Sequence, residues 1–221
     1  GGAIYLKSNT KDDKTVFTMN GGELSHNVGG SVASVINIMG SHPVEVNLLG
    51  GAFVNNSMTT TGANLACISA TNDGSTVVIG GVKFAGNTDK NGETINALTL
   101  STHNVTLIPT EDTDFQDPIY INNAYGSYKD VAIRVPEGLT KLKGKLPILL
   151  AKEFVGAATI SGGTGEGAYA LQPSDMEKVH VVNDIDGAYY LEVNENNTAV
   201  FAEVKTNDIV VYLSGNGNDT N

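Results

Sequence analysis

The sequence has few of the residues that cross-link a chain or give it positive charge. It holds one cysteine among 221 residues, so no disulfide can form within the chain and a small disulfide-stapled fold is excluded. Thirteen lysines and arginines face 24 acidic residues, and the formal net charge of −11 disfavours binding to nucleic acid or anionic lipid. No apolar run approaches the roughly 18 residues of a membrane span, so we expect no membrane insertion.

Tryptophan is also absent, and proline occurs six times. The lack of tryptophan weighs against a sugar-binding surface built from stacking aromatic rings. What the chain does have is glycine, at 26 positions, together with a hydrophobic fraction of 40%. This composition is typical of a folded chain with many turns and a sizeable core, and it is not that of a disordered chain.

A repeat of about 30 residues runs through the first half of the chain. In three places a large apolar residue stands three positions before an asparagine, and the spacing between successive copies is 29 and then 31 residues. The apolar members are Leu24, Phe53 and Phe84, and the asparagines are Asn27, Asn56 and Asn87.

Short β-prone runs recur with the same period. Each repeat holds about three such runs, separated by Gly, Asn and Asp, and no ten-residue segment of residues 1–108 has helical apolar spacing. Short strands, tight corners and a fixed period favour a β-solenoid. The runs are residues 3–6, 15–19, 35–38, 44–48, 65–68, 76–79, 97–100 and 105–108.

Stacking of the repeats predicts a structural role for the six repeated residues. Equivalent positions of adjacent coils lie about 4.8 Å apart along a solenoid axis. Leu24, Phe53 and Phe84 should therefore form an inward apolar stack. Asn27 and the equivalent asparagines should form an amide ladder at one corner.

The motifs of residues 1–108 resemble those of known surface proteins. The opening Gly1-Gly2-Ala3-Ile4 and the F-x-x-N pairs that start at Phe53 and Phe84 are similar to repeats in chlamydial polymorphic outer-membrane autotransporters and in large surface proteins of gut Firmicutes. The pair that starts at Leu24 departs from the pattern by having leucine. This resemblance implies a right-handed parallel β-helix on a bacterial cell surface, often adhesive. We expect the chain to be a fragment of such a longer extracellular protein.

The repeat fades in the second half, which we divide by pattern. Residues 1–117 are predicted to be β-helix coils, residues 118–204 final coils and a β-rich cap, and residues 205–221 a terminal strand and linker. The cap is expected to contain one short helix near residues 172–179, with Ser174 as its N-cap, followed by a hairpin. A cap is needed because an uncovered solenoid end exposes unpaired strand edges.

Two candidate sites compete with a purely structural interpretation. Asn87-Thr88-Asp89 matches a piece of the polygalacturonase active site, but the Gly-His-Gly and Arg-x-Lys motifs of those enzymes are absent. The acidic segment from Glu111 to Asp117 offers oxygen ligands of the kind that calcium prefers, although a solvated acidic corner is the commoner outcome. We therefore assign no catalytic residue, no metal and no cofactor.

The sequence as a whole favours a non-catalytic extracellular module that is adhesive or acts as a structural spacer. Its partner would be a host or microbial surface ligand, either protein or glycan. The alternative is a carbohydrate-active β-helix that binds or cleaves a polysaccharide, since this fold also carries such enzymes.

Overall fold

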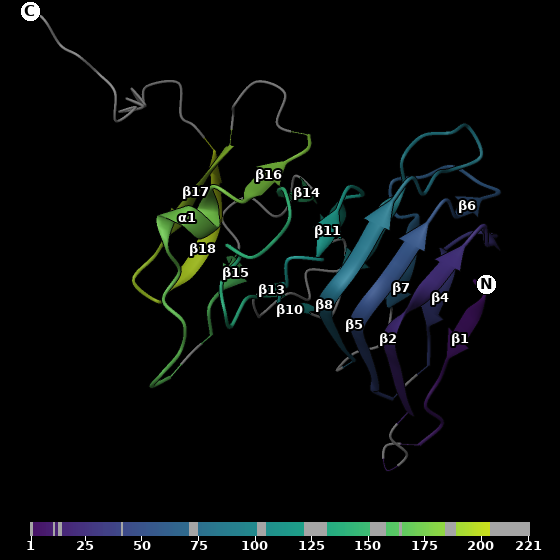
Figure 1. Cartoon of the computed structure of the whole chain (residues 1–221), viewed down its shortest axis with the longest axis horizontal. Coiled ribbons are helices and arrows are strands. Elements are labelled where there is room, and N and C mark those ends of the chain that lie inside the picture. The colour runs from purple at the N-terminus through teal and green to yellow at the C-terminus, as the bar shows by residue number, and fades with distance from the viewer. Residues whose placement is uncertain are drawn as a thin grey trace, which may run out of the picture.

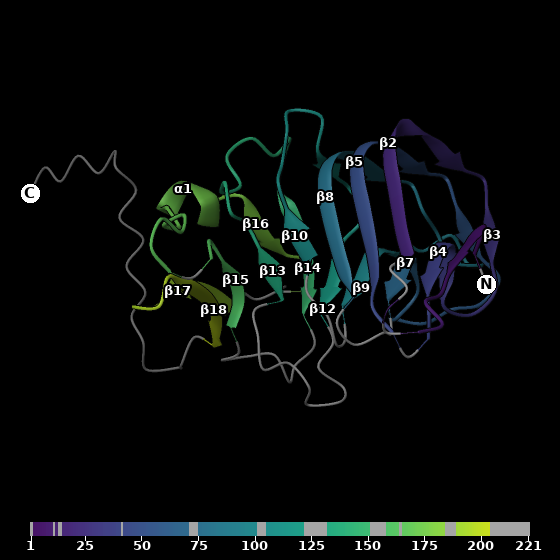
Figure 2. The ribbon, with the colours of Figure 1, turned by 90° about the horizontal axis from the view of Figure 1, so that it is seen from below.

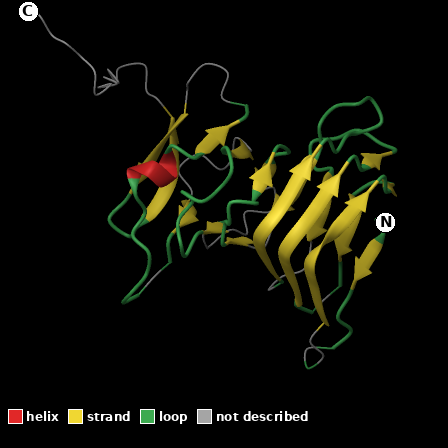
Figure 3. Ribbon diagram, in the orientation of Figure 1, coloured by secondary structure: helices red, strands yellow, loops and turns green. Residues whose placement is uncertain are grey.

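The chain is a parallel β-solenoid, as the repeat predicts (Figures 1 and 3). The computed structural model describes residues 2–10, 12, 15–40, 42–70, 75–100, 105–121, 132–150, 158–163, 165–183 and 189–203. The predicted terminal strand and linker of residues 205–221 lie outside this range. Nearly all regular structure in the described residues is β, with one short helix, α1 (Pro173–Met176).

One wall of the solenoid is a seven-stranded parallel sheet. Each coil contributes one strand, and inward-pointing apolar residues stand in register from strand to strand, beginning with Ile4, Ile36 and Ile68 and continuing to Val181. In sheet order the strands are β1 (Ile4–Leu6), β4 (Ala33–Ile38), β7 (Ala66–Ala70), β9 (Asn96–Leu100), β12 (Ile119–Ile121), β14 (Leu146–Leu150) and β16 (Val179–Val181).

The facing wall is a longer sheet that changes character at its end. Its strands pair in parallel as far as β15 and then antiparallel through β18 and β17. Figure 2 shows the strands of both walls succeeding one another along the molecule. In sheet order the strands are β2 (Thr15–Ser25), β5 (Val44–Val54), β8 (Thr76–Ala85), β10 (Val105–Leu107), β13 (Ile133–Arg134), β15 (Ala158–Ser161), β18 (Thr198–Glu203) and β17 (Tyr189–Val193).

Three short strands complete the coils. β11 (Asp114–Phe115) pairs with the second half of β8, while β3 (Val28–Gly29) and β6 (Ser57–Met58) form a separate parallel pair. The long strands β2 and β5 each contain a glycine at positive φ, Gly22 at 90° and Gly51 at 108°. This backbone conformation changes the direction of the strand, so one long strand supplies two of the three expected runs of a coil.

Several features of the second half differ from the sequence prediction. The helix begins at Pro173 with Gln172 as its N-cap, so Ser174 as N-cap is wrong. Strands β15 and β16 were not predicted. The segment from Glu111 to Asp117, predicted to be an acidic corner, contains strand β11. In the part of the chain that the structure describes, no helix is long and apolar enough to cross a bilayer.

The glycine within β5 provides a test of this geometry. A Cβ added to Gly51 would lie 2.6 Å from the Gly22 carbonyl oxygen of the preceding coil, at a φ that side chains disfavour. Gly51→Ala should therefore lower the free energy of unfolding by roughly 2 to 4 kcal/mol in a urea titration. Gly30→Ala is the matched control, because a Cβ at Gly30 meets nothing within 4 Å. Equal losses for both variants would contradict the assigned strand geometry.

Candidate functional site

The three repeated asparagines form a hydrogen-bonded ladder from coil to coil. The backbone N–H and the side-chain amide of Asn27 donate to Oδ1 of Asn56, at 3.0 and 2.9 Å. The same two groups of Asn56 donate to Oδ1 of Asn87, at 2.9 and 2.8 Å. Each amide oxygen thus accepts two hydrogen bonds from the coil before it, which joins coils that are 29 and 31 residues apart in sequence.

The amides of Asn56 and Asn87 also donate in the opposite direction, to the coil before them. The Nδ2 of Asn56 donates to the carbonyl of Leu24 at 2.9 Å, and the Nδ2 of Asn87 donates to the carbonyl of Phe53 at 2.9 Å. One amide therefore binds three successive coils. Asn56 and Asn87 are fully buried, so their polar groups would be costly without these partners.

A stack of aromatic rings lies beside the amide ladder. The Phe53 and Phe84 rings have centroids 4.9 Å apart with planes inclined by 20°, and Phe84 and Phe115 follow at 5.2 Å and 17°. Leu24 occupies the equivalent position in the first coil, opposite Phe53. The predicted apolar stack of Leu24, Phe53 and Phe84 thus gains a fourth member, Phe115, that sequence reasoning missed.

The amide ladder also has a fourth rung, and it is a carboxylate. The Nδ2 of Asn87 donates a short hydrogen bond to Oδ2 of Asp117, 30 residues further along the chain. Phe115 and Asp117 are two positions apart, where the earlier coils have three. The carbonyl of Phe84, which an amide would otherwise bind, accepts the backbone N–H of Gln116 at 2.9 Å instead.

Burial changes the acidity of this last rung. Asp117 is 2% exposed, and its burial raises the pKa of the carboxyl from 3.8 to about 6, although hydrogen bonds from Asn87 and Gly86 act in the opposite direction. The pKa of the Cys67 thiol lies well above its usual range, mainly because the thiol is buried. The negative charge of Asp117 is the second cause. Cys67 is completely buried in β7 and belongs to the hydrophobic core.

The polygalacturonase-like residues take part in the solenoid framework. Asn87 is a ladder rung. The Thr88 N–H donates to the Asn56 carbonyl at 2.9 Å. Oδ1 of Asp89 accepts the N–H groups of Asn91 and Glu93, at 2.7 and 3.0 Å, and so closes its own loop.

The acidic segment divides its carboxylates between separate partners. Asp117 belongs to the ladder, while Oδ2 of Asp114 accepts from Gln116 at 3.1 Å and lies 3.9 Å from Nζ of Lys143. Among the residues that the structure describes, no group of three or more His, Cys, Asp or Glu side chains could hold a metal ion.

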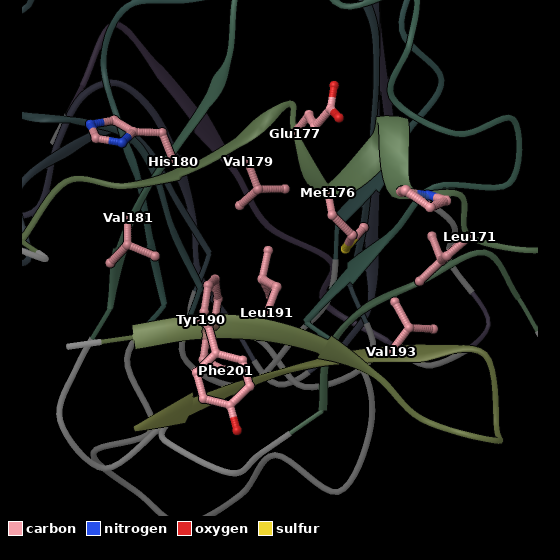
Figure 4. A pocket seen from close by; sticks show the side chains of 11 residues that line it. Leu171, Met176, Glu177, Val179, His180, Val181, Tyr190, Leu191, Val193 and Phe201 are labelled. Carbon is pink, nitrogen blue, oxygen red and sulfur yellow. The ribbon is translucent and has the colours of Figure 1, made fainter. Parts of the chain in front are cut away.

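Two of the grooves on the described surface differ clearly in polarity. A polar groove of about 690 Å³ crosses the coils over the glycines Gly50, Gly51 and Gly81, with Lys83 and Lys143 among its lining residues. An apolar groove of about 760 Å³ lies at the C-terminal end, between α1 and β16 on one side and β17 and β18 on the other (Figure 4).

Comparison with known proteins gives no relative for this arrangement: no protein-family model, no curated protein and no solved structure matches the chain.

The ladder predicts a large and position-specific effect on stability. Asn56→Ala removes the amide that bridges three coils and leaves the Leu24 carbonyl and the Asn27 N–H without it, so the free energy of unfolding should fall by about 3 to 5 kcal/mol. Asn20→Ala, at an exposed position of β2, should change it by no more than about 0.5 kcal/mol. Urea titrations of both variants check this, and similar losses would argue against the ladder.

The last rung predicts a dependence of stability on pH. A carboxyl whose pKa is higher in the folded than in the unfolded chain binds more protons when folded, between about pH 4 and pH 6. The free energy of unfolding should therefore fall as pH rises through this window, by about 3 kcal/mol from this residue. Asp117→Asn removes the contribution, because an amide does not titrate.

Urea titrations of both proteins from pH 4 to pH 8 isolate the effect of Asp117, since all other titrating groups are shared. The variant should gain stability relative to the parent as pH rises. A difference between the two proteins that stays constant over this range would contradict a raised pKa.

Proposed function

We propose that this chain is a non-catalytic module of an extracellular bacterial surface protein, in which the solenoid acts as a spacer or as an adhesive face. The observation that carries this proposal is the continuous ladder from Asn27 to Asp117. The most regularly placed polar residues of the chain serve contacts between coils.

The physical consequence of the ladder supports a spacer. Each coil binds only its neighbours, so coils can be added along one axis without a change in the contacts of the others. Such an architecture holds distant points of a chain at a fixed separation. The resemblance of residues 1–108 to surface-protein repeats supports the extracellular location.

The distribution of charge bears on the kind of partner. The net charge of −11 disfavours nucleic acid and anionic polymers and helps to keep an exposed surface soluble. A neutral glycan or a protein surface with basic character fits this charge better than a polyuronate does.

The polar groove favours a second candidate, binding of a polysaccharide. Gly50, Gly51 and Gly81 supply no side chains to its floor, so a ligand could reach the backbone, and Lys83 and Asp114 at its sides offer hydrogen-bonding groups of both kinds. The groove crosses several coils, which suits an extended chain rather than a compact ligand.

The first experiment is binding of the purified chain to an array of glycans and extracellular-matrix proteins, with release of reducing ends assayed on the same polysaccharides. Binding without release of reducing ends is expected for an adhesive module. The absence of both binding and release supports a spacer. Release that persists in rigorously purified protein would refute the non-catalytic assignment.

If a glycan binds, one pair of variants locates the site. Lys83→Ala should weaken binding when the polar groove is used. Lys141→Ala, an exposed lysine outside that groove that pairs with Glu137 at 3.2 Å, should leave binding unchanged.

A further inference from the structure

The three strands of the first coil form the N-terminal end of the solenoid. β1 is the outermost strand of the seven-stranded sheet, β2 is the outermost strand of the longer sheet, and β3 is one edge of the two-stranded pair. Figure 1 shows β1 at the end of the molecule opposite to α1. Among the described strands, each strand of this coil has a partner on one side only, so its other edge can accept a further strand.

The apolar layer of the first coil is only partly covered. Phe17 and Leu24 pack against the core but are partly exposed. Their register partners in the second coil, Val46 and Phe53, are completely buried. The same contrast holds in the other sheet, where β4 is buried throughout and β1 is not. The exposed layer therefore has the composition of a coil interface that lacks its second side.

The amide ladder has a direction, and its accepting end lies in the first coil. Oδ1 of Asn56 and Oδ1 of Asn87 each accept two hydrogen bonds, from the backbone N–H and the side-chain amide of the asparagine one coil earlier. Asn27 makes the same donations, but none of the described residues donates to its own Oδ1. The matching donors are the backbone N–H and the amide of one further asparagine.

The backbone next to Asn27 is open in the same direction. The N–H of Ser57 donates to the Asn27 carbonyl of the coil before it, at 2.9 Å. Val28 is the register partner of Ser57, and equivalent residues of parallel strands direct their backbone groups to the same side. The N–H of Val28 therefore points toward the N-terminal end, where the side chain of Val28 is 64% exposed.

The other end of the ladder does not supply the matching donors. The last rung is Asp117, a carboxylate, which accepts from Asn87 and has no amide to donate. The described strands that end the longer sheet, β18 and β17, contain no asparagine. A second copy of the chain stacked end to end would therefore leave Oδ1 of Asn27 without its partner, so self-assembly does not satisfy this end.

We propose that the N-terminal end of the solenoid binds an extended polypeptide segment that runs parallel to β2 and carries a large apolar residue three positions before an asparagine. The asparagine donates its N–H and its amide to Oδ1 of Asn27, and its carbonyl accepts the N–H of Val28. The apolar residue packs on Leu24. The segment thus repeats the contacts that the first coil makes with the second, and the solenoid gains a sequence-specific site for strand addition.

A synthetic peptide with the sequence of residues 44–58 tests the proposal, because these residues form such an interface in the structure. Added to the full chain, it should bind in isothermal titration calorimetry. The same peptide with Asn56→Asp lacks the amide donor and should bind at least about 10-fold more weakly. Asn47→Asp in the peptide is the matched control, because Asn47 lies outside the ladder, and it should change binding by less than about 2-fold.

Hydrogen exchange locates the bound peptide. Exchange of the Val28 amide should slow by about 10-fold or more when the peptide is present, while the amides of β17 at the other end should exchange as before. The chain variant Asn27→Ala, which removes the accepting oxygen, should weaken binding of the parent peptide, and its own circular-dichroism spectrum and Tm show whether it is folded at the temperature of the titration.

Three results would overturn the proposal. Absence of binding by the parent peptide, or equal binding by the peptides with Asn56→Asp and Asn47→Asp, would mean that the end does not recognise the asparagine. Protection of β17 in place of Val28 would assign the peptide to the C-terminal end. A concentration-dependent dimer of the chain alone that Asn27→Ala abolishes would assign this end to a second copy.

Discussion

The structure depends on one interaction, the side-chain amide that binds its own coil to the coils on both sides. A buried asparagine can do this because it carries an acceptor and two donors on one short side chain. Asn56 uses all of them, accepting from Asn27 and donating to Asn87 and to the Leu24 carbonyl. The ladder fixes the relative register of the coils at one corner, so variation in loop length must be absorbed elsewhere, as the unequal spacings of 29, 31 and 30 residues require.

The end of the ladder follows from the same chemistry. A carboxylate accepts but does not donate, so Asp117 can receive the amide of Asn87 but cannot bind a carbonyl of the preceding coil. The coil is one residue shorter between Phe115 and Asp117, and this brings the Gln116 N–H to the Phe84 carbonyl that would otherwise lack a partner. The shorter spacing thus supplies, through the Gln116 N–H, the hydrogen bond to the Phe84 carbonyl that an aspartate side chain cannot donate. The ring stack continues through Phe115.

The sequence predicted the first half of the fold because the repeat multiplies weak signals. A three-residue strand is invisible alone, but Leu24, Phe53 and Phe84 at nearly equal spacing define a coil. Where the repeat fades, single short strands such as β16 had nothing to compare with and were missed. Phe115 and Asp117 stand 31 and 30 residues after Phe84 and Asn87, so the period could have revealed them. Their acidic neighbours favour a calcium site instead, and the two-residue separation of Phe115 and Asp117 departs from the three-residue motif.

The cap shows how a solenoid can end. Parallel strands leave an edge of the same kind at every coil, so growth along the axis has no intrinsic stop. β18 runs antiparallel to β15, and the buried Asp175 ties helix α1 to an earlier coil by accepting the Leu139 N–H at 2.7 Å. The same carboxylate accepts the Tyr169 hydroxyl and the N–H of the N-cap residue Gln172, at 2.8 and 2.9 Å, which fixes the start of the helix. In this part of the chain the amide ladder is absent from the described residues. The antiparallel pairing of β18 with β15 and the hydrogen bonds that Asp175 accepts join the segments instead. The longer sheet thereby ends in two antiparallel strands, β18 and β17, whereas the seven-stranded sheet ends in β16, which pairs in parallel like the strands before it. The two walls of the solenoid therefore do not end alike, and this difference is the physical origin of the apolar groove between them.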